Sequence, residues 1–321
     1  MRSRELFRQK FVIRDYIVYF VFVAVFIFFT ITIGNKGFLS GQNLLSILRS
    51  NSMECVLSVA VTYVIACGEF DLSVGSTAAL GACVSALVMQ SGGGVLVAVL
   101  AGLGSGALVG VANGLLVAKV GIPSFIATVG TQMVVRGIAK WVSSSTSIIV
   151  TNEKFLQIFG QKDVLPNFSV LIVWLIGAAI VGYIIFNKTR YGRQVLATGA
   201  NRTAAEFSGV NTARIKFLVM FIVAIVAALA GLLYAGLMST AKSTIGEGGL
   251  ELDAIAAVVL GGAALSGGKA SIVGTVVAAI LIGFINNGIV IMGMSIEQQY
   301  IVTGAIIVAA VAFGQTTRVK E

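Results

Sequence analysis

Long apolar stretches separated by short polar segments run through most of the chain. A helix needs about twenty residues to cross the hydrocarbon core of a membrane, and the pattern predicts ten such helices. The predicted spans are residues 16–33, 53–67, 76–89, 95–117, 125–141, 168–186, 217–238, 254–265, 272–292 and 298–313. Three of them are short. We expect these to be broken or embedded helices, because bare backbone in lipid is costly.

Composition supports an all-α, polytopic transmembrane bundle in a single domain over residues 1–321. The chain is 57% hydrophobic and only 11% charged, whereas soluble domains have roughly 25% charged residues. The absence of histidine excludes imidazole ligands and bases, and the three cysteines lack metal-site or disulfide spacing. No catalytic cluster is visible, so we expect a protein that is not an enzyme and has no cofactor or metal of its own.

Positive charge is concentrated in a few segments. Residues 187–216 contain six cations and one acid, Glu206. The positive-inside rule places this segment and the basic N-terminus in the cytoplasm. Counting ten crossings then puts both termini inside, and the loops 142–167 and 239–253 outside. The net charge of +9 therefore indicates membrane topology and not a nucleic-acid partner.

A short helix is predicted within the basic segment 187–216. Thr203 and Glu206 have capping-box spacing, in which each side chain bonds the backbone amide of the other residue. Gly209 can adopt the left-handed conformation that ends a helix. Exposed side chains would be those of Ala204, Phe207 and Val210. The pattern fits two interpretations, a loop that caps itself and a docking element for a cytoplasmic partner, and does not decide between them.

A second polar segment, residues 68–76 (GEFDLSVGS), lies between the second and third predicted spans. Carboxylates between apolar runs are costly unless they reach water, a cation or helix amides. Asp71 or Ser73 could cap the third span, and Glu69 has no equally good local partner. We expect a solvated cytoplasmic turn, with a proton relay as the alternative. The candidate pathway residues are Glu69, Asp71, Ser73, Asn113, Asn286 and Asn287.

Two further motifs suggest little on their own. Residues 111–114 (VANG) and 285–288 (INNG) lie five spans apart and suggest an inverted repeat, as in transporters, or two unrelated Asn-Gly pairs. Residues 263–270 (AALSGGKA) look like a phosphate loop, but the first glycine and the hydroxyl after the lysine are missing. We expect that this chain does not bind ATP itself.

Three of these segments, in order, resemble the permease subunits of simple-sugar ABC importers of the ribose, xylose and autoinducer-2 type. Residues 68–76 are similar to the family's GGIDLSVGS, except that Glu69-Phe70 replaces Gly-Ile. Residues 199–216 are similar to its G-G-N…A…S-G-I…K segment, and residues 249–268 to its most recognisable run. The Asn-Asn-Gly at 286–288 also fits, so the resemblance covers roughly residues 45–315.

The resemblance implies a permease in the bacterial cytoplasmic (inner) membrane that pairs with a second permease subunit, identical or related. Two cytoplasmic ATPase subunits, which hold ATP and magnesium, would drive it. An extracytoplasmic solute-binding protein would deliver a simple sugar or sugar-like solute to the outer loops.

By the same resemblance, the short cytoplasmic helix is the element that couples the permease to the ATPase. Its coupling residues would be Asn201, Thr203, Ala204, Ala205, Glu206, Phe207, Ser208, Gly209 and Val210. The alternative hypothesis is an ion-coupled secondary transporter that uses Glu69 or Asp71.

Overall fold

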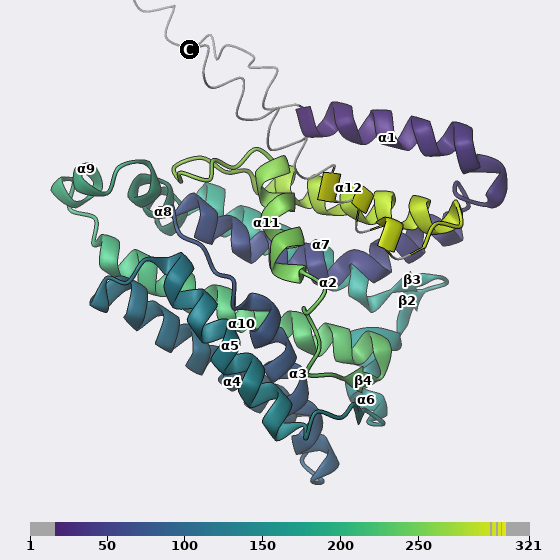
Figure 1. Ribbon diagram of the computed structural model, residues 1–321, viewed down its shortest axis with the longest axis horizontal. Coiled ribbons are helices and arrows are strands. Elements are labelled where there is room, and N and C mark those ends of the chain that lie inside the picture. Colours follow the sequence, from purple (N-terminus) through teal and green to yellow (C-terminus); the bar gives the residue numbers. More distant parts are fainter. Residues whose placement is uncertain (1–16, 296, 300, 303, 306–321) are drawn as a thin grey trace, which may run out of the picture.

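Long helices lie side by side in the computed structural model, which describes residues 17–295, 297–299, 301, 302, 304 and 305 (Figure 1). The helices are α1 (Ile17–Ile33), α2 (Gly41–Ala66), α3 (Val74–Gln90), α4 (Val95–Leu115), α5 (Ser124–Val142), α6 (Glu153–Leu156), α7 (Val170–Lys188), α8 (Arg190–Ala200), α9 (Arg202–Phe207), α10 (Thr212–Met238), α11 (Leu250–Leu260) and α12 (Ile272–Ile291). Shorter helical turns are η2 (Gly34–Lys36), η3 (Leu116–Val120) and η4 (Gln157–Gln161).

Helix α10 is the centre of the bundle and packs against α2, α3 and α4. Small residues make this close packing achievable, as is usual for helices in lipid. A Cβ added at Gly231 would lie 1.9 Å from the carbonyl oxygen of Ala78 on α3. On α4, a Cβ at Gly106 would lie 2.6 Å from the Cβ of Ala228. The abundant glycines therefore bring backbones together.

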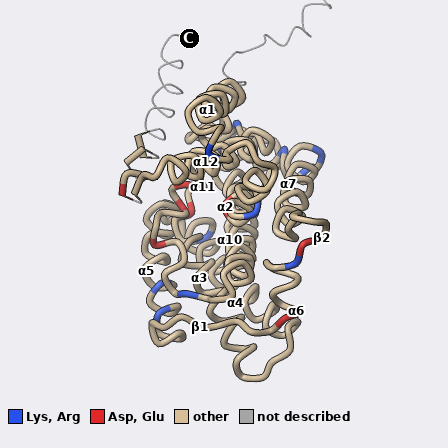
Figure 2. Tube along the Cα trace, turned by 90° about the vertical axis from the view of Figure 1, so that its right-hand side faces the viewer, with Lys and Arg blue, Asp and Glu red and all other residues tan. Residues whose placement is uncertain are grey.

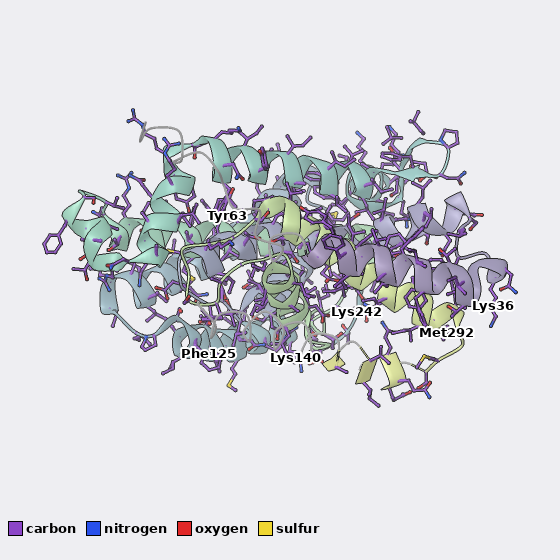
Figure 3. All side chains as sticks on the ribbon, turned by 90° about the horizontal axis from the view of Figure 1, so that it is seen from above. Lys36, Tyr63, Phe125, Lys140, Lys242 and Met292 are labelled. Carbon is purple, nitrogen blue, oxygen red and sulfur yellow. The ribbon has the colours of Figure 1, made fainter. Side chains whose placement is uncertain are left out.

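Helices α5 and α7 lie on opposite flanks of the bundle (Figure 2). Figure 2 views the molecule along its long helices and shows α5 on one flank, α7 on the other and α10 between them. Helix α12 packs on α1, α2 and α11. Phe125 and Lys140, near the two ends of α5, both lie at an edge of the bundle in Figure 3.

Six helical segments among the described residues are long and apolar enough to cross a membrane: α1 with η2, α2, α4 with η3, α7, α10 and α12. A polytopic helical protein is thus confirmed, but the count of ten spans stays a prediction. Helix α3 has 17 residues and α11 has 11. Helix α5 contains Arg136 and Lys140 and is not apolar enough to qualify. The predicted span 298–313 lies largely outside the described residues.

Helix α2 begins twelve residues before its predicted start, at Gly41. Ser40 caps it by accepting a hydrogen bond from the amide of Asn43 (3.2 Å). The extra turns are polar, yet Asn51 and Ser52 are buried. Asn51 Nδ2 donates to the carbonyl of Ala279 on α12 (2.5 Å), so a partner helix satisfies the polar group that sequence alone leaves unpaired.

Two short strand pairs add to the predicted all-α bundle. Strand β1 (Ile148–Ile149) pairs antiparallel with β4 (Thr240–Ala241), and β2 (Asp163–Leu165) pairs with β3 (Phe168–Ser169). The β1–β4 pair joins the two loops that were predicted to share one side of the membrane. Figure 1 shows these strands at one end of the molecule and α8 and α9 at the other.

Candidate coupling helix and polar core

The predicted short helix exists as α9, but a different residue caps it. The side chain of Asn201 accepts the amide hydrogen of Ala204 (3.0 Å), and Thr203 lies inside the helix. The capping-box prediction is therefore wrong. Asparagine ranks above threonine as an N-cap, and the carboxylate of Glu206 turns instead toward α10.

The predicted end of α9 is confirmed. Gly209 has a φ of 83°, in the left-handed region. Its amide donates to the carbonyl of Glu206 (2.9 Å), and the amide of Val210 donates to that of Ala205 (3.0 Å). These two bonds form a Schellman motif, which satisfies carbonyls at a helix end.

Helix α9 lies at one extremity of the molecule (Figure 1) and carries one large exposed aromatic side chain. Phe207 is 88% exposed, and Ala204 is exposed beside it. Val210 differs from the prediction, since it packs partly against the main core. Ala205 is buried on the opposite side of the helix. The exposed apolar surface of α9 is therefore small, and Phe207 is its one large side chain.

Glu206 ties α9 to the first turn of α10. Its Oε1 accepts hydrogen bonds from Thr212 Oγ1 (2.5 Å) and Arg202 Nε (2.9 Å). The hydrogen bond from Thr212 is the main cause, and that from Arg202 the next, of a pKa of Glu206 below its ordinary value. The carboxylate therefore stays charged, and α9 is fastened to α10.

One turn further along α10, Lys216 forms an ion pair with Glu69. Glu69 is 7% exposed, so the prediction of a solvated turn is wrong. The side chain of Lys216 is itself 17% exposed. A buried carboxylate needs such a partner, and no pattern near residue 69 could reveal a lysine 147 residues away in the sequence. The pair joins the α2–α3 segment to the end of α10 that adjoins α9.

Three of the predicted pathway residues meet in one buried network. Oδ1 of Asp71 accepts hydrogen bonds from both the amide (2.8 Å) and the hydroxyl (2.6 Å) of Ser73. Asn113 Nδ2 on α4 donates to the same hydroxyl oxygen (2.9 Å). Thr131 on α5 then donates to Asn113 Oδ1 (2.6 Å). The network links the break between α2 and α3 to two other helices.

The predicted cap of α3 is only partly right. Ser73 stands at the N-cap position, but its side chain caps no helix amide. Asp71 accepts the amide of Ser73 instead. Asp71 and Ser73 are both fully buried, at 1% and 0% exposure.

Helix α5 satisfies the irregular backbone between α2 and α3. Ser124 Oγ accepts the amide of Phe70 (3.0 Å), and Thr128 Oγ1 accepts that of Leu72 (3.2 Å). Non-helical backbone is tolerated inside a membrane protein where other groups satisfy it in this way. Neither hydroxyl was predicted from the sequence to have this role.

The same face of α5 continues into a polar stripe with four-residue spacing. Its members are Ser124, Thr128, Gln132, Arg136 and Lys140. Gln132 donates to Glu251 on α11 (2.8 Å), and Arg136 to the carbonyls of Ser243 (2.6 Å) and Ile245 (2.5 Å). Lys140 pairs with Glu247 (2.8 Å) and thereby holds the pKa of that carboxyl below its ordinary value. Spacing of four places residues on one helix face, and this was the signal available in the sequence.

Asn286 and Asn287 lie apart from this network. Asn287 exchanges two hydrogen bonds with Asn43 on α2, both 3.1 Å. Asn286 is half-buried beside it on α12. The six candidate pathway residues therefore fall into three places, and the structure brings together only Asp71, Ser73 and Asn113. Their role in a pathway stays a prediction, as does the inverted repeat.

Glycines from all three family-like motifs converge at one point. A Cβ at Gly199 would lie 2.0 Å from the carbonyl oxygen of Ala66, and a Cβ at Gly267 2.8 Å from Cα of Gly68. The amide of Gly268 donates to the same Ala66 carbonyl (2.9 Å). The Ser-Gly-Gly-Lys run thus uses its glycines for backbone packing. We refer to Gly68, Gly199, Gly267 and Gly268 as the glycine junction.

The apolar spans and their buried polar breaks define the class: a polytopic helical membrane permease. Residues 43–311 match the family described as the permease component of the branched-chain amino acid transport system, and the chain belongs to this family. Among the described residues, no group of three or more Cys, Asp or Glu is arranged to hold a metal ion.

Curated relatives extend over nearly the whole chain. The ribose import permease protein RbsC of Escherichia coli (strain K12) is 37% identical over 279 residues, 86% of this chain and 87% of the relative. The L-arabinose ABC transporter permease protein AraH of Azospirillum brasilense is 32% identical, over 93% of this chain and 87% of its own. No solved structure matched the chain. These similarities confirm the resemblance to sugar-importer permeases.

Proposed function

We propose that this chain is the membrane-spanning permease subunit of an ATP-driven importer for a simple sugar or sugar-like solute. Full-length similarity to permeases of ribose and arabinose transport carries this proposal. A further relative, the galactose/methyl galactoside import permease protein MglC of Haemophilus influenzae, is 31% identical over 94% of both chains. The chain has no catalytic role in the proposal; ATP and magnesium belong to partner ATPase subunits.

Helix α9 is the proposed contact with the ATPase. Phe207 would enter a groove of the partner, because large exposed aromatic side chains are typical anchors of interfaces. The coupling residues Asn201 to Val210 supply the cap, the fastening to α10 and the Schellman end that hold Phe207 in place. A displaced α9 would move α10 through Thr212, and Lys216 would pass that motion to the segment at Glu69.

The opposite end of the molecule is the proposed contact with a solute-binding protein. In this orientation both termini are cytoplasmic, the membrane is the bacterial inner membrane, and the loops 142–167 and 239–253 face outward. The β1–β4 pairing supports a shared surface made of both loops. Helix α5 offers an exposed apolar face beside its polar stripe, including Met133 and Val134. We assign that face to a second permease subunit, identical or related.

The coupling assignment is tested by replacing Phe207 with alanine. Truncation of an anchor residue costs about 2 kcal/mol or more, so Phe207→Ala should weaken ATPase binding about thirtyfold. Phe20→Ala is the matched control, since Phe20 is 67% exposed on α1, which packs against α12. Copurification of the ATPase and solute uptake into proteoliposomes are the two measurements.

A double change examines the helix as a whole. Glu206→Ala with Gly209→Ala removes the fastening to α10 and the left-handed end, so uptake should be abolished while membrane insertion stays intact. Normal uptake in this variant would refute the role of α9. Uptake driven by an ion gradient without any ATPase would instead support a secondary transporter.

A further inference from the structure

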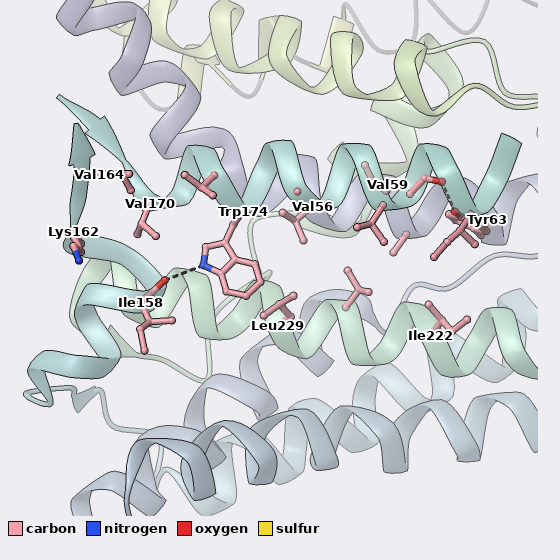
Figure 4. A pocket seen from close by; sticks show the side chains of 18 of the residues that line it. Val56, Val59, Tyr63, Ile158, Lys162, Val164, Val170, Trp174, Ile222 and Leu229 are labelled. Atoms are coloured by element: carbon pink, nitrogen blue, oxygen red, sulfur yellow. Dashed lines mark hydrogen bonds between the residues drawn. The ribbon is translucent and has the colours of Figure 1, made fainter. Parts of the chain in front are cut away.

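An apolar cavity of about 900 Å³ separates α7 from α10 on the flank opposite α5 (Figure 4). Helix α7 packs against α2 along its length, and the cavity lies beside that contact. Val173 and Val181 on α7 face it, as do Ile222 and Leu229 on α10. Trp174 projects into it, and its indole nitrogen donates to the carbonyl of Ile158 (2.9 Å). Such walls do not suit a sugar, whose hydroxyls need polar partners.

The two ends of the cavity are chemically different. At the end toward α8, Tyr63 closes it with a hydrogen bond from its hydroxyl to the carbonyl of Gly182 (2.6 Å), and Tyr191 stacks on that ring. At the strand-bearing end, it adjoins a second cavity of about 520 Å³. Both cavities share Gln157 and Lys162. The space is thus apolar along its length and polar at one mouth.

The dimensions match a lipid chain. From Val170 to Ile185, the lining residues of α7 follow the helix for about 22 Å at 1.5 Å per residue. One leaflet of a bilayer contributes about 15 Å of hydrocarbon, half of the core. The cavity is therefore longer than the part of an acyl chain that lies in one leaflet, and a chain could enter it from the strand-bearing end.

The polar mouth carries one charge of each sign. Lys162 and Glu153 both line the second cavity, together with Leu156, Gln157 and Gln161. Among the described residues, neither Lys162 nor Glu153 takes part in a salt bridge. A cation suits a phosphate, and a carboxylate suits an ammonium group. Lys162 and Glu153 together therefore match a lipid headgroup that contains a phosphate and an ammonium group.

We propose that the cavity between α7 and α10 binds an acyl chain of a zwitterionic aminophospholipid, with the lipid phosphate at Lys162 and its ammonium group at Glu153. The site is independent of the proposed transport function. Its occupant would hold α7 against the bundle, since it fills the space that protein side chains leave between α7 and α10.

Native mass spectrometry of the full chain with added phosphatidylethanolamine or phosphatidylglycerol tests the site. Gly177 faces the cavity, and no atom lies within 4 Å of a Cβ placed there. Gly177→Phe should fill the cavity and remove the bound lipid. Gly104→Phe is the matched control, because Gly104 on α4 has equally open space outside the cavity. Equal lipid binding in the wild type and Gly177→Phe would overturn the proposal.

The headgroup assignment is tested with surface variants that leave the apolar walls intact. Lys162→Ala should weaken binding of both lipids about fivefold, the effect of one cation at a membrane surface. Lys154→Ala, an exposed lysine outside both cavities, should change nothing. Glu153→Gln should abolish the preference for phosphatidylethanolamine only. No preference in the wild type would overturn the headgroup assignment.

A change of oligomeric state in Gly177→Phe, with lipid binding retained, would assign the cavity to contact between copies instead.

Discussion

At the residue scale, the Glu69–Lys216 pair distinguishes this chain from the sequence pattern of the sugar-importer permeases, which it otherwise follows. The family pattern GGIDLSVGS has a glycine where this chain has Glu69, whereas Lys216 matches the family pattern. In this structure the lysine has an acidic partner in a largely buried setting. A pair of this kind is costly to break and contributes little net stability as a pair.

Removing one partner should therefore cost more than removing both. We expect Glu69→Leu or Lys216→Leu alone to lower the free energy of unfolding by about 3 kcal/mol, and the double variant to lose much less than the sum. Denaturant titration in mixed micelles measures this. Arg202→Leu is the control, since its exposed pair with Glu206 should contribute at most about 1 kcal/mol. Additive losses would contradict a direct pair.

Asp71 acts in the structure as a hydrogen-bond acceptor for Ser73. An asparagine keeps an oxygen in the same place, and the other carboxylate oxygen has no partner in the described residues. Asp71→Asn should thus change stability little, whereas Asp71→Ala should cost about 1–3 kcal/mol by leaving buried donors unpaired. Thermal unfolding compares the two variants. Loss of uptake in a stable, assembled Asp71→Asn protein would show that the charge itself serves transport.

At the element scale, helix α5 shows what the sequence could have revealed. Its hydropathy predicted one more span, and that expectation considered only apolar content. The polar positions Ser124, Thr128, Gln132, Arg136 and Lys140 recur every four residues, which places them on one face. The stripe was therefore visible, but its partners were not, since they come from the α2–α3 break, from α11 and from the segment before α11.

In helix α8, helix propensity and packing predict opposite effects of one substitution on stability. Alanine is a better helix former than glycine by up to about 1 kcal/mol, so Gly199→Ala in α8 would be stabilising on propensity alone. The added Cβ would instead overlap the Ala66 carbonyl at 2.0 Å, and overpacking should cost about 1–3 kcal/mol. We expect a lower unfolding temperature. Gly130→Ala on α5, where the space is open, is the control and should not destabilise.

At the scale of the whole molecule, the two ends are assigned to opposite sides of the membrane. Lys242 is exposed near β4, and Arg193 is exposed on α8. In intact cells, a membrane-impermeant thiol reagent should modify Lys242→Cys and leave Arg193→Cys unmodified until the cells are opened. The native cysteines are buried and should react little. Modification of Arg193→Cys in sealed cells would reverse the orientation.

Sequence patterns predicted most of the helices, the short helix α9 and the positions of the polar breaks, because each depends on residues close together in the chain. They failed where the partner is distant. Glu69 is buried because Lys216 on α10 pairs with it. The cap of α9 differs for a local reason: Asn201 is the stronger N-cap, and Glu206 bonds Thr212 instead of completing a capping box. The strand pair β1–β4 could not be predicted either, since its two-residue strands have no periodicity of their own.

The glycine junction has a consequence for building chimeras from related permeases. Its members come from three separate stretches of the chain, and each fits only against the backbone of the others. A hybrid that takes one stretch from another permease inherits a surface shaped for a different neighbour. Exchange of residues near 68 for a glycine-bearing version would also leave Lys216 without its acid. Successful hybrids should therefore transplant all three stretches together.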